Sequence, residues 1–251
     1  MNAVSLLRYP GGKTRAVNRL LSLIPEGVEI CSPFVGGASV EIALSNRGQM
    51  VKCYDNYEPI VCFWQSVASN ANLLHKKVLN ISNCYNVDKL MFKDFQESIK
   101  NRGKDMDAKF FILNRCSFSG STNSGGMSKN HPRFNKSCTD KMLNFKSKNI
   151  TFELMDFKES IKENPEAFLF LDPPYDIDCF LYGDKGSTHK NFDHNGLSKI
   201  LNSRKNWLMT YNDNGYIRDL YKDCKIEEIE WAYGMNKSKK SNEIIITPTP
   251  Y

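Results

Sequence analysis

The chain has 251 residues, a formal net charge of +6 and 41% hydrophobic residues. This composition fits one large domain, or one domain with a smaller domain inserted into it, and it excludes global disorder. No apolar run approaches the roughly 20 residues that span a bilayer, and charged Arg8 precedes any apolar segment of a secretory signal, so we expect a cytoplasmic protein without a membrane partner.

Apolar periodicity predicts helices that alternate with strands at both ends of the chain. From the N-terminus we expect a helix over 14–24, a strand over 28–31, a helix over 38–44 and a strand over 50–54. Helical patterns then dominate from 58 to about 115, and a weak helix is expected near 140–145. Strand patterns return at 150–154, 167–171, 207–211, 226–231 and 243–247, with helices between most of them. This alternation predicts an α/β fold with a mainly parallel sheet and a helical insertion.

Positive charge is concentrated in the predicted insertion. Residues 100–148 contain eleven Lys and Arg against three Asp and no Glu, whereas the rest of the chain is slightly acidic. The same segment contains a small, polar stretch over 117–126 in which no regular element is expected. A solvated surface is one interpretation, but a basic segment with a loop is also what binding to a phosphate backbone requires. We therefore expect Arg115, Lys129 and Arg133 to contact nucleic acid.

Two motifs follow the first two predicted strands, at the edge where open α/β sheets bind ligands. Gly36 and Gly37 follow Phe34 after the strand at 28–31, and they would let the backbone approach a ligand at the start of the next helix, although a tight turn is the commoner reason for such a pair. Asp55 ends the second strand, 18 residues after Gly37. At that distance an acidic residue commonly accepts hydrogen bonds from ribose hydroxyls, and a helix cap is the alternative.

The most specific motif is Asp172-Pro173-Pro174-Tyr175, directly after the buried strand at 167–171. Two prolines cannot continue a sheet ladder, so the chain must leave the strand in a rigid, extended form. The Asp172 carboxylate and the Pro173 carbonyl are then held in fixed directions, and an aromatic ring follows. Two acceptors beside a stacking ring suit a planar group that carries an amine.

Two familiar nucleotide-binding classes and a metal site are not supported. The chain has no G-x-G-x-x-G, and Gly12-Lys13-Thr14 imitates the end of a phosphate-binding loop whose first glycine is replaced by Leu7. The eight cysteines are well separated and form no C-x-x-C pair, which predicts reduced thiols and no bound metal.

Five separated motifs resemble, in the same order, those of the Dam-type DNA adenine methylases, the alpha group of the D12 class of N6-adenine methyltransferases. They are Arg-Tyr-Pro-Gly-Gly-Lys at 8–13, Pro-Phe-Val-Gly-Gly at 33–37, Asp55, the motif at 172–175, and Lys-Ser-Asn-Glu-Ile-Ile-Ile at 240–246. The resemblance implies a Rossmann-like methyltransferase fold, with a mixed sheet flanked by helices and an inserted, mainly helical DNA-recognition domain. It implies a catalytic domain over 1–57 and 149–251 and a DNA target-recognition domain over 58–148.

The same resemblance implies S-adenosylmethionine as the cofactor, with no metal. It assigns the cofactor site to Tyr9, Pro10, Gly11, Gly12 and Lys13, to Phe34, Gly36 and Gly37 under the methionine portion, to Asp55 at the ribose, and to Asp172. Asp156 and Phe157 resemble the residues at the cofactor adenine, with a helix cap as the alternative for Asp156.

Two further segments resemble family motifs on the DNA side. Asn114-Arg115 with Phe118-Ser119-Gly120 is similar to a DNA-binding segment in which the family has Asn in the position of Ser119. His194 follows Phe192 and Asp193 in a late motif beside the target pocket, and a helix residue without a role is the equal alternative.

The family chemistry agrees with the motif at 172–175. The exocyclic N6 of adenine is a poor nucleophile because its lone pair is delocalised into the ring. If Asp172 and Pro173 accept its two hydrogens, the lone pair can point at a sulfonium methyl group, so that positioning and electrostatics dominate the reaction. Pro174 keeps this turn rigid. The base must leave the duplex to reach the pocket, and Tyr175 is the expected stacking partner.

Several alternatives stay open at this point. Methylation of cytosine N4 uses the same amino-group chemistry, and RNA could replace DNA as the substrate. A catalytically silent DNA-binding specificity module is the alternative outside the enzymes. Cytosine C5 methylation is unsupported, because it needs a Pro-Cys nucleophile and none of the ten prolines precedes Cys. We expect double-stranded DNA as the partner, a monomer or weak dimer, and a cognate restriction endonuclease as a further candidate partner.

Overall fold

The computed structural model describes residues 5–9, 11–122, 131–146, 148–176, 192–232 and 240–249. Within them the chain forms a seven-stranded sheet with the strand order β3-β2-β1-β4-β5-β7-β6. The strands are β1 (Ile30–Ser32), β2 (Val51–Asp55), β3 (Ile150–Leu154), β4 (Phe168–Leu171), β5 (Trp207–Asn212), β6 (Lys225–Ala232) and β7 (Lys240–Thr247). Neighbouring strands from β3 to β5 are parallel, whereas β7 pairs antiparallel with both β5 and β6. The expected mixed α/β sheet is thus confirmed.

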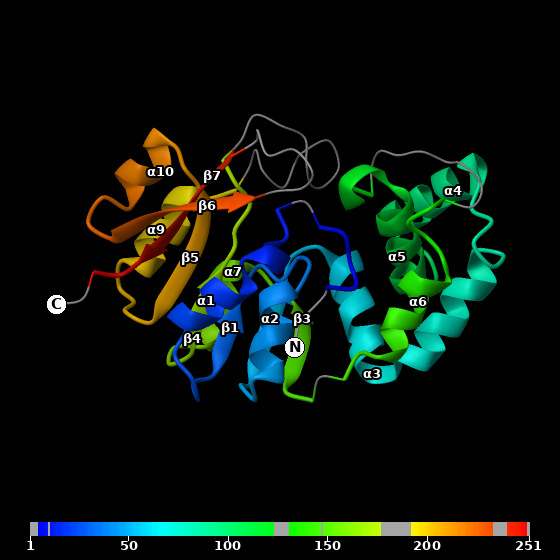
Figure 1. Cartoon of the computed structure of the whole chain (residues 1–251), viewed down its shortest axis with the longest axis horizontal. Coiled ribbons are helices and arrows are strands. Elements are labelled where there is room, and N and C mark those ends of the chain that lie inside the picture. Colours follow the sequence, from blue (N-terminus) through cyan, green and yellow to red (C-terminus); the bar gives the residue numbers. More distant parts are fainter. Residues whose placement is uncertain are drawn as a thin grey trace.

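Helices connect most of the strands. Those of the sheet region are the short 3₁₀ helix η1 (Lys13–Arg15), α1 (Val17–Leu23), α2 (Ser39–Asn46), α7 (Phe157–Glu163), α9 (His194–Leu201) and α10 (Gly215–Leu220). Between β2 and β3 the chain forms α3 (Glu58–Ile81), α4 (Lys89–Lys100), α5 (Met106–Cys116), the 3₁₀ helix η2 (Phe118–Gly120) and α6 (Lys136–Leu143). Figure 1 shows these latter helices gathered on one side of the molecule and β4 to β7 on the other.

Both faces of the sheet are buried, because successive side chains of a strand point to opposite faces. On β5, Leu208 packs with the apolar residues of α1, α2 and α3, while Trp207 and Met209 pack with those of α7, α9 and α10. On β4, Phe170 packs with the same apolar residues as Leu208, and its neighbour Leu169 packs with the same apolar residues as Trp207 and Met209. The result is a three-layer arrangement in which the sheet is covered on either side by helices.

Helix α3 contacts both the sheet and the helices of the insertion. Asn70 has non-helical backbone angles and divides it, and the Asn70 side chain accepts a hydrogen bond from the Leu73 amide. Before this kink, Trp64 stacks on Phe152 of β3 with ring centroids 5.4 Å apart. Beyond it, Lys77 pairs with Asp107 of α5. The first half of α3 therefore covers the sheet while it also packs on α5, where Phe63 stacks on Phe111 with ring centroids 5.5 Å apart, and the second half continues along the insertion. The boundary of the two domains expected from the sequence stays a prediction.

Several expected elements differ from the structure by a few residues at their ends, and two of these differences have a clear physical reason. The first strand runs over 30–32 instead of 28–31, since its length is set by pairing with β2 and β4 rather than by its β-branched residues. Helix α6 starts at Lys136, earlier than the weak helix expected near 140–145. Asn135 caps it by accepting a hydrogen bond from the Cys138 amide at 3.1 Å, a local signal that apolar periodicity does not contain.

Candidate active site

The carboxyl ends of the parallel strands meet at one edge of the sheet, and the segments that follow them enclose a pocket. The edge lies where the strand order reverses, with β1 between β2 and β4, the usual ligand position in an open α/β sheet. The pocket is lined by residues of η1 and of the segments after β1, β2 and β4: Tyr9, Gly11, Gly12, Lys13, Phe34, Val35, Gly36, Gly37, Ala38, Ser39, Val40, Glu41, Asp55, Asn56, Phe170, Asp172, Pro173, Pro174, Tyr175 and Phe192. Tertiary structure thus brings together all three motifs expected at strand ends.

The glycine loop after β1 is shaped to receive the Tyr9 ring. Gly36 has φ +43°, and a Cβ there would lie 2.9 Å from Tyr9 Cε1, while a Cβ on Gly37 would lie 3.0 Å from Tyr9 Cβ. The Trp64 indole donates a hydrogen bond to the Gly36 carbonyl at 3.0 Å, which fixes the loop from the side of α3. The two glycines are therefore required for close packing against Tyr9, a reason more specific than a tight turn.

Asp55 stands at the end of β2 beside this loop. Its Oδ2 accepts a hydrogen bond from the Gly36 amide at 3.2 Å, and its Oδ1 accepts one from the Tyr57 amide at 3.0 Å. Burial raises the pKa of the Asp55 carboxyl to about 6, although both backbone bonds favour its ionised form. The carboxylate thus fixes the loop after β1 and also lines the pocket.

Asp172 is held by three donors, which lie on η1, on β5 and in the turn after β4. Lys13 Nζ, with only 3% of its side chain exposed, lies 2.9 Å from Asp172 Oδ1 and 3.0 Å from Oδ2. Thr210 of β5 donates to Oδ1 at 2.8 Å, and the Tyr175 hydroxyl donates to the same oxygen at 3.2 Å. Lys13 also reaches the Tyr175 hydroxyl at 2.7 Å and lies 3.8 Å from Glu243. The orientation of the Asp172 carboxylate is therefore fixed from both the N-terminal segment and the sheet.

Tyr211 of β5 also supports the turn at 172–175. Its ring stacks on Tyr175 with centroids 5.7 Å apart, and its hydroxyl donates to the Pro174 carbonyl at 3.4 Å. The hydroxyl also bonds His194 Nδ1 at the start of α9. His194, whose role the sequence left undecided, is thus connected to the Pro-Pro turn through Tyr211.

Asp156 and Phe157 lie outside the pocket lining. Asp156 caps α7 by accepting a hydrogen bond from the Lys158 amide at 2.9 Å. The Phe157 ring contacts Phe34 and Phe192, with centroids 5.7 and 5.2 Å away, and both of these rings line the pocket. Asp156 thus caps α7 and Phe157 contacts two rings of the pocket wall, while their expected place at the cofactor adenine stays a prediction.

Glu41 is a charged pocket residue that belongs to none of the motifs. Glu41 of α2 is only 3% exposed, and its Oε1 accepts a hydrogen bond from Ser32 Oγ at 2.7 Å. Burial raises the pKa of this carboxyl to about 7, and the nearby Asp172 adds to the increase. A buried acid in an otherwise apolar or small-residue stretch of helix is the signal that sequence reasoning could have used.

A second group of charged residues lies where the N-terminal motif meets the insertion. Burial, Arg133 and Arg115 together lower the pKa of the Arg8 guanidinium. Burial, Arg133 and Arg8 likewise lower the pKa of His131. Arg115 Nε donates to the Arg133 carbonyl at 3.0 Å. Nη1 of Arg8 is a buried donor without a hydrogen-bond partner among the described residues. Two predicted contact residues, Arg115 and Arg133, thus share an electropositive cluster with Arg8 and His131, which sequence reasoning missed.

Asn114 joins this cluster to the N-terminal motif. It is fully buried, its Oδ1 accepts a hydrogen bond from the Arg8 amide at 2.9 Å, and its Nδ2 donates to the Arg8 and Gly120 carbonyls at 2.8 and 3.0 Å. Gly120 has φ +81°, and a Cβ there would lie 1.7 Å from the Arg8 carbonyl oxygen. Asn114 and Gly120 of the family-like segment therefore have a physical reason: they hold the backbone at Arg8.

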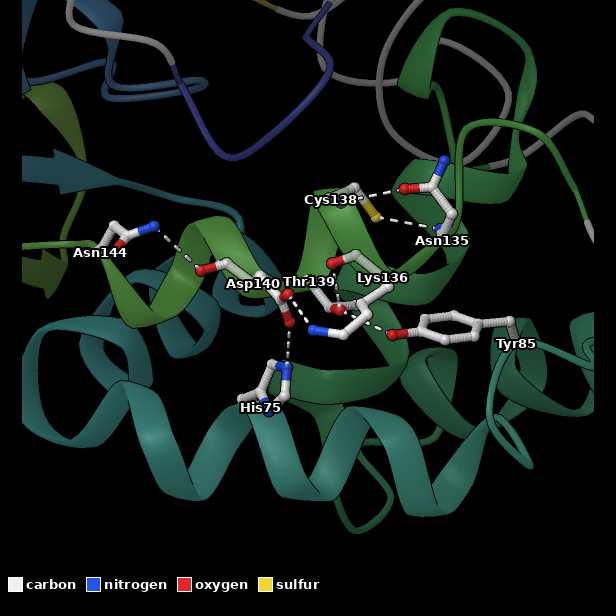
Figure 2. A network of polar contacts seen from close by, with 8 residues as sticks. All are labelled: His75, Tyr85, Asn135, Lys136, Cys138, Thr139, Asp140 and Asn144. Atoms are coloured by element: carbon white, nitrogen blue, oxygen red, sulfur yellow. Dashed lines mark hydrogen bonds and ion pairs between the residues drawn. The ribbon is translucent and has the colours of Figure 1, made fainter.

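Helix α6 follows the His131–Arg133 turn and is fixed on α3 by polar contacts. Figure 2 shows His75 of α3 directed at Asp140, with Nε2 3.2 Å from Oδ1, and Tyr85 directed at Thr139, with their hydroxyl oxygens 2.9 Å apart. Lys136 pairs with Asp140 one turn along α6. The His75 and Tyr85 contacts fix the helix that follows directly after the His131–Arg133 segment of the electropositive cluster.

Some predicted residues lie outside the described part of the chain. Pro10 and Lys129 are among them, as are 123–126 of the expected loop, and the described part of residue 119 does not include its side chain. Among the residues that are described, no group of three or more His, Cys, Asp or Glu could hold a metal ion, and seven cysteines are free. The helices of this part include none that is long and apolar enough to cross a membrane.

Comparison with known proteins adds one match. The family model described as D12 class N6 adenine-specific DNA methyltransferase matches residues 9–235, which include the pocket, the helices between β2 and β3, and most of the strands. A search of curated proteins finds no match.

Proposed function

The chain belongs to the D12 class of N6 adenine-specific DNA methyltransferases, and we propose that Asp172, Pro173 and Tyr175 hold its target adenine while Asp55 and the loop after β1 hold the methyl donor. The observation that carries this proposal is one shared pocket: Asp172 at the end of β4 and Asp55 at the end of β2 line the same cavity. The family match supports methylation of adenine in DNA, and it therefore favours N6 of adenine over N4 of cytosine as the methylated atom.

The pocket fits S-adenosylmethionine, the methyl donor that the family implies. The cofactor supplies a methyl group on a sulfonium sulfur, and its positive charges match a pocket lined by the carboxyls of Glu41, Asp55 and Asp172. Gly36 and Gly37 line the pocket with Tyr9 packed against them. A carboxylate has about four acceptor positions, so Asp55 can accept ribose hydroxyls in addition to its two backbone amides. Pro10, Gly11, Gly12 and Lys13 complete this site in the proposal.

Asp172 and Pro173 are proposed to accept the two hydrogens of the adenine amino group. Lys13 and Thr210 orient the Asp172 carboxylate through contacts of 2.8 to 3.0 Å. The Tyr175 contact is longer, at 3.2 Å, and we expect the amino group to replace it. The Tyr175 ring, already stacked on Tyr211, then carries the base on its pocket side. Fixed acceptors of this kind lower the barrier because they need no reorganisation during the reaction.

DNA is proposed to approach from the side of the insertion. Arg8, Arg115 and Arg133 repel one another in the free protein, and a phosphate would relieve that repulsion. Lys129 and Ser119 belong to the same proposed surface. The target adenine must be flipped out of the duplex to reach the pocket. We assign residues 58–148 to DNA recognition and 1–57 with 149–251 to catalysis, while a cognate restriction endonuclease, a monomeric or weakly dimeric state and a cytoplasmic location remain predictions from the sequence.

The experiment compares Asp172→Ala with Asp176→Ala, a neighbouring exposed carboxylate outside the pocket lining. Methyl transfer to duplex DNA and the identity of the modified nucleoside are measured with purified protein. Asp172→Ala should lower turnover on the order of 10²-fold or more with nearly unchanged DNA affinity, because an oriented acceptor acts mainly in the transition state. Asp176→Ala should stay close to wild type. Retention of more than about a tenth of wild-type turnover by Asp172→Ala would contradict the assignment.

A further inference from the structure

Glu41 has a position that folding alone does not explain. It is the third residue of α2, and with Val40 and Ile42 it belongs to a turn that is almost completely buried. Its side-chain hydrogen-bond partner, Ser32 at the end of β1, is fully buried as well. An apolar side chain of similar size at such a position commonly stabilises a fold at least as well as a buried carboxyl does. A buried carboxyl at this position is therefore better explained by an interaction with a bound ligand than by the stability of the folded chain.

No cation of the described chain neutralises Glu41. The ion pairs of the pocket run from Lys13 to Asp172 and to Glu243, and none in the described residues reaches Glu41. Asp172 instead acts on Glu41 as a like charge. The first turn of α2 contributes backbone hydrogen bonds to the carboxylate, but burial outweighs them. A cationic group of a ligand would restore the balance of charge in this part of the pocket.

The pocket geometry indicates which end of the ligand this is. Asp55, the proposed ribose acceptor, binds the Gly36 amide, and the glycine loop leads from there into the first turn of α2, where Glu41 lies. Moving from Asp55 along the loop to Glu41 therefore moves away from the nucleoside and toward the amino acid portion of the cofactor. Resting on the proposed function, we infer that Glu41 binds the positively charged α-amino group of S-adenosylmethionine. This residue belongs to none of the motifs that the resemblance assigns to the cofactor.

The charged and titratable groups around Glu41 come from three elements. Asp172 after β4 acts on it directly, and Lys13 of η1 lies beyond Asp172. Cys53 of β2 also faces it, and burial keeps the pKa of that thiol well above the ordinary value. Asp55 lines the same pocket but is assigned to the ribose, which every adenosine ligand shares.

The test measures binding of two adenosine ligands by calorimetry. S-adenosylhomocysteine carries the α-amino group, whereas 5′-deoxy-5′-methylthioadenosine has the same nucleoside and sulfur but no amino acid portion. Glu41→Gln should weaken S-adenosylhomocysteine binding by about 10- to 100-fold at pH 8 and leave methylthioadenosine binding unchanged, because only the first ligand loses a charged hydrogen bond. Asp55→Asn is the matched control and should weaken both ligands by a similar factor.

A second measurement follows the pH dependence of ligand preference in the wild type. With its pKa near 7, Glu41 is mostly ionised at pH 8 and mostly protonated at pH 6 in the free protein. The preference of the wild type for S-adenosylhomocysteine over methylthioadenosine should therefore fall about tenfold from pH 8 to pH 6, and the ratio should be flat in Glu41→Gln. Titration of Asp55 affects both ligands and cancels in this ratio.

Two outcomes would overturn the inference, and they differ. If Glu41→Gln keeps the wild-type ligand preference at both pH values, Glu41 is only an acid in the first turn of a helix. If the wild type binds neither adenosine ligand, the proposed cofactor pocket itself is wrong and the inference about Glu41 is wrong with it.

Discussion

Gly120→Ala isolates the junction between the N-terminal motif and the insertion. The new Cβ would lie 1.7 Å from the Arg8 carbonyl oxygen, so the backbone of one segment must move. The left-handed conformation at φ +81° costs about 1–2 kcal/mol for a residue with a side chain. Displacement also weakens the three hydrogen bonds of fully buried Asn114, each of which contributes about 1 kcal/mol. We expect the free energy of unfolding to fall by about 3–5 kcal/mol.

The chain contains a matched control for this substitution. Gly27 has φ +72°, and a Cβ added there would meet no atom within 4 Å, so Gly27→Ala measures the backbone cost alone, about 1–2 kcal/mol. Urea denaturation at 25 °C gives both values, and duplex DNA binding gives the functional consequence. Gly120→Ala should also weaken DNA binding, since Arg8 and Arg115 would no longer be held together, whereas Gly27→Ala should not. Equal destabilisation by the two substitutions would refute the steric argument at Arg8.

The remaining predictions concern charge. Arg133→Ala should weaken DNA binding and reduce the slope of log affinity against log salt by about one. Lys162→Ala, in the last turn of α7, is the control and should leave this slope unchanged. Superimposable slopes for Arg133→Ala and wild type would exclude a phosphate contact at Arg133. Because burial raises the pKa of Glu41 to about 7 and that of Asp55 to about 6, the folded state binds protons before the unfolded state does, and the free energy of unfolding should rise by up to a few kcal/mol from pH 8 to pH 5. The lowered pKa of His131 has the opposite effect on the free energy of unfolding, because the unfolded state takes up a proton at this histidine at a higher pH than the folded state does. Urea denaturation of wild type and Glu41→Gln at several pH values measures this dependence. If the free energy of unfolding of Glu41→Gln changes with pH as much as that of the wild type, burial of Glu41 does not cause the change.

The sequence predicted most elements of the fold, because the pattern that defines them is local. The strand over 150–154 has the same bounds in the structure, and the strand before the Pro-Pro turn differs by one residue. Apolar runs followed by Asp55 and by Asp172 were enough to predict acids at the ends of two strands. The family resemblance implied a mixed sheet, but only the structure shows that β7 pairs antiparallel with β5 and β6, since alternating side chains look the same in parallel and antiparallel strands.

By itself, then, the sequence determined the α/β class and the order of the motifs, and it predicted the chemistry at 172–175, since each depends on residues that are close along the chain. Only the tertiary structure decided that Lys13 fixes Asp172 across 159 positions, that Asn114 clamps Arg8, and that Glu41 belongs to the pocket. Contacts such as these are made by residues from different elements, and their strength depends on burial and on neighbouring charge. Neither quantity exists until the chain has folded.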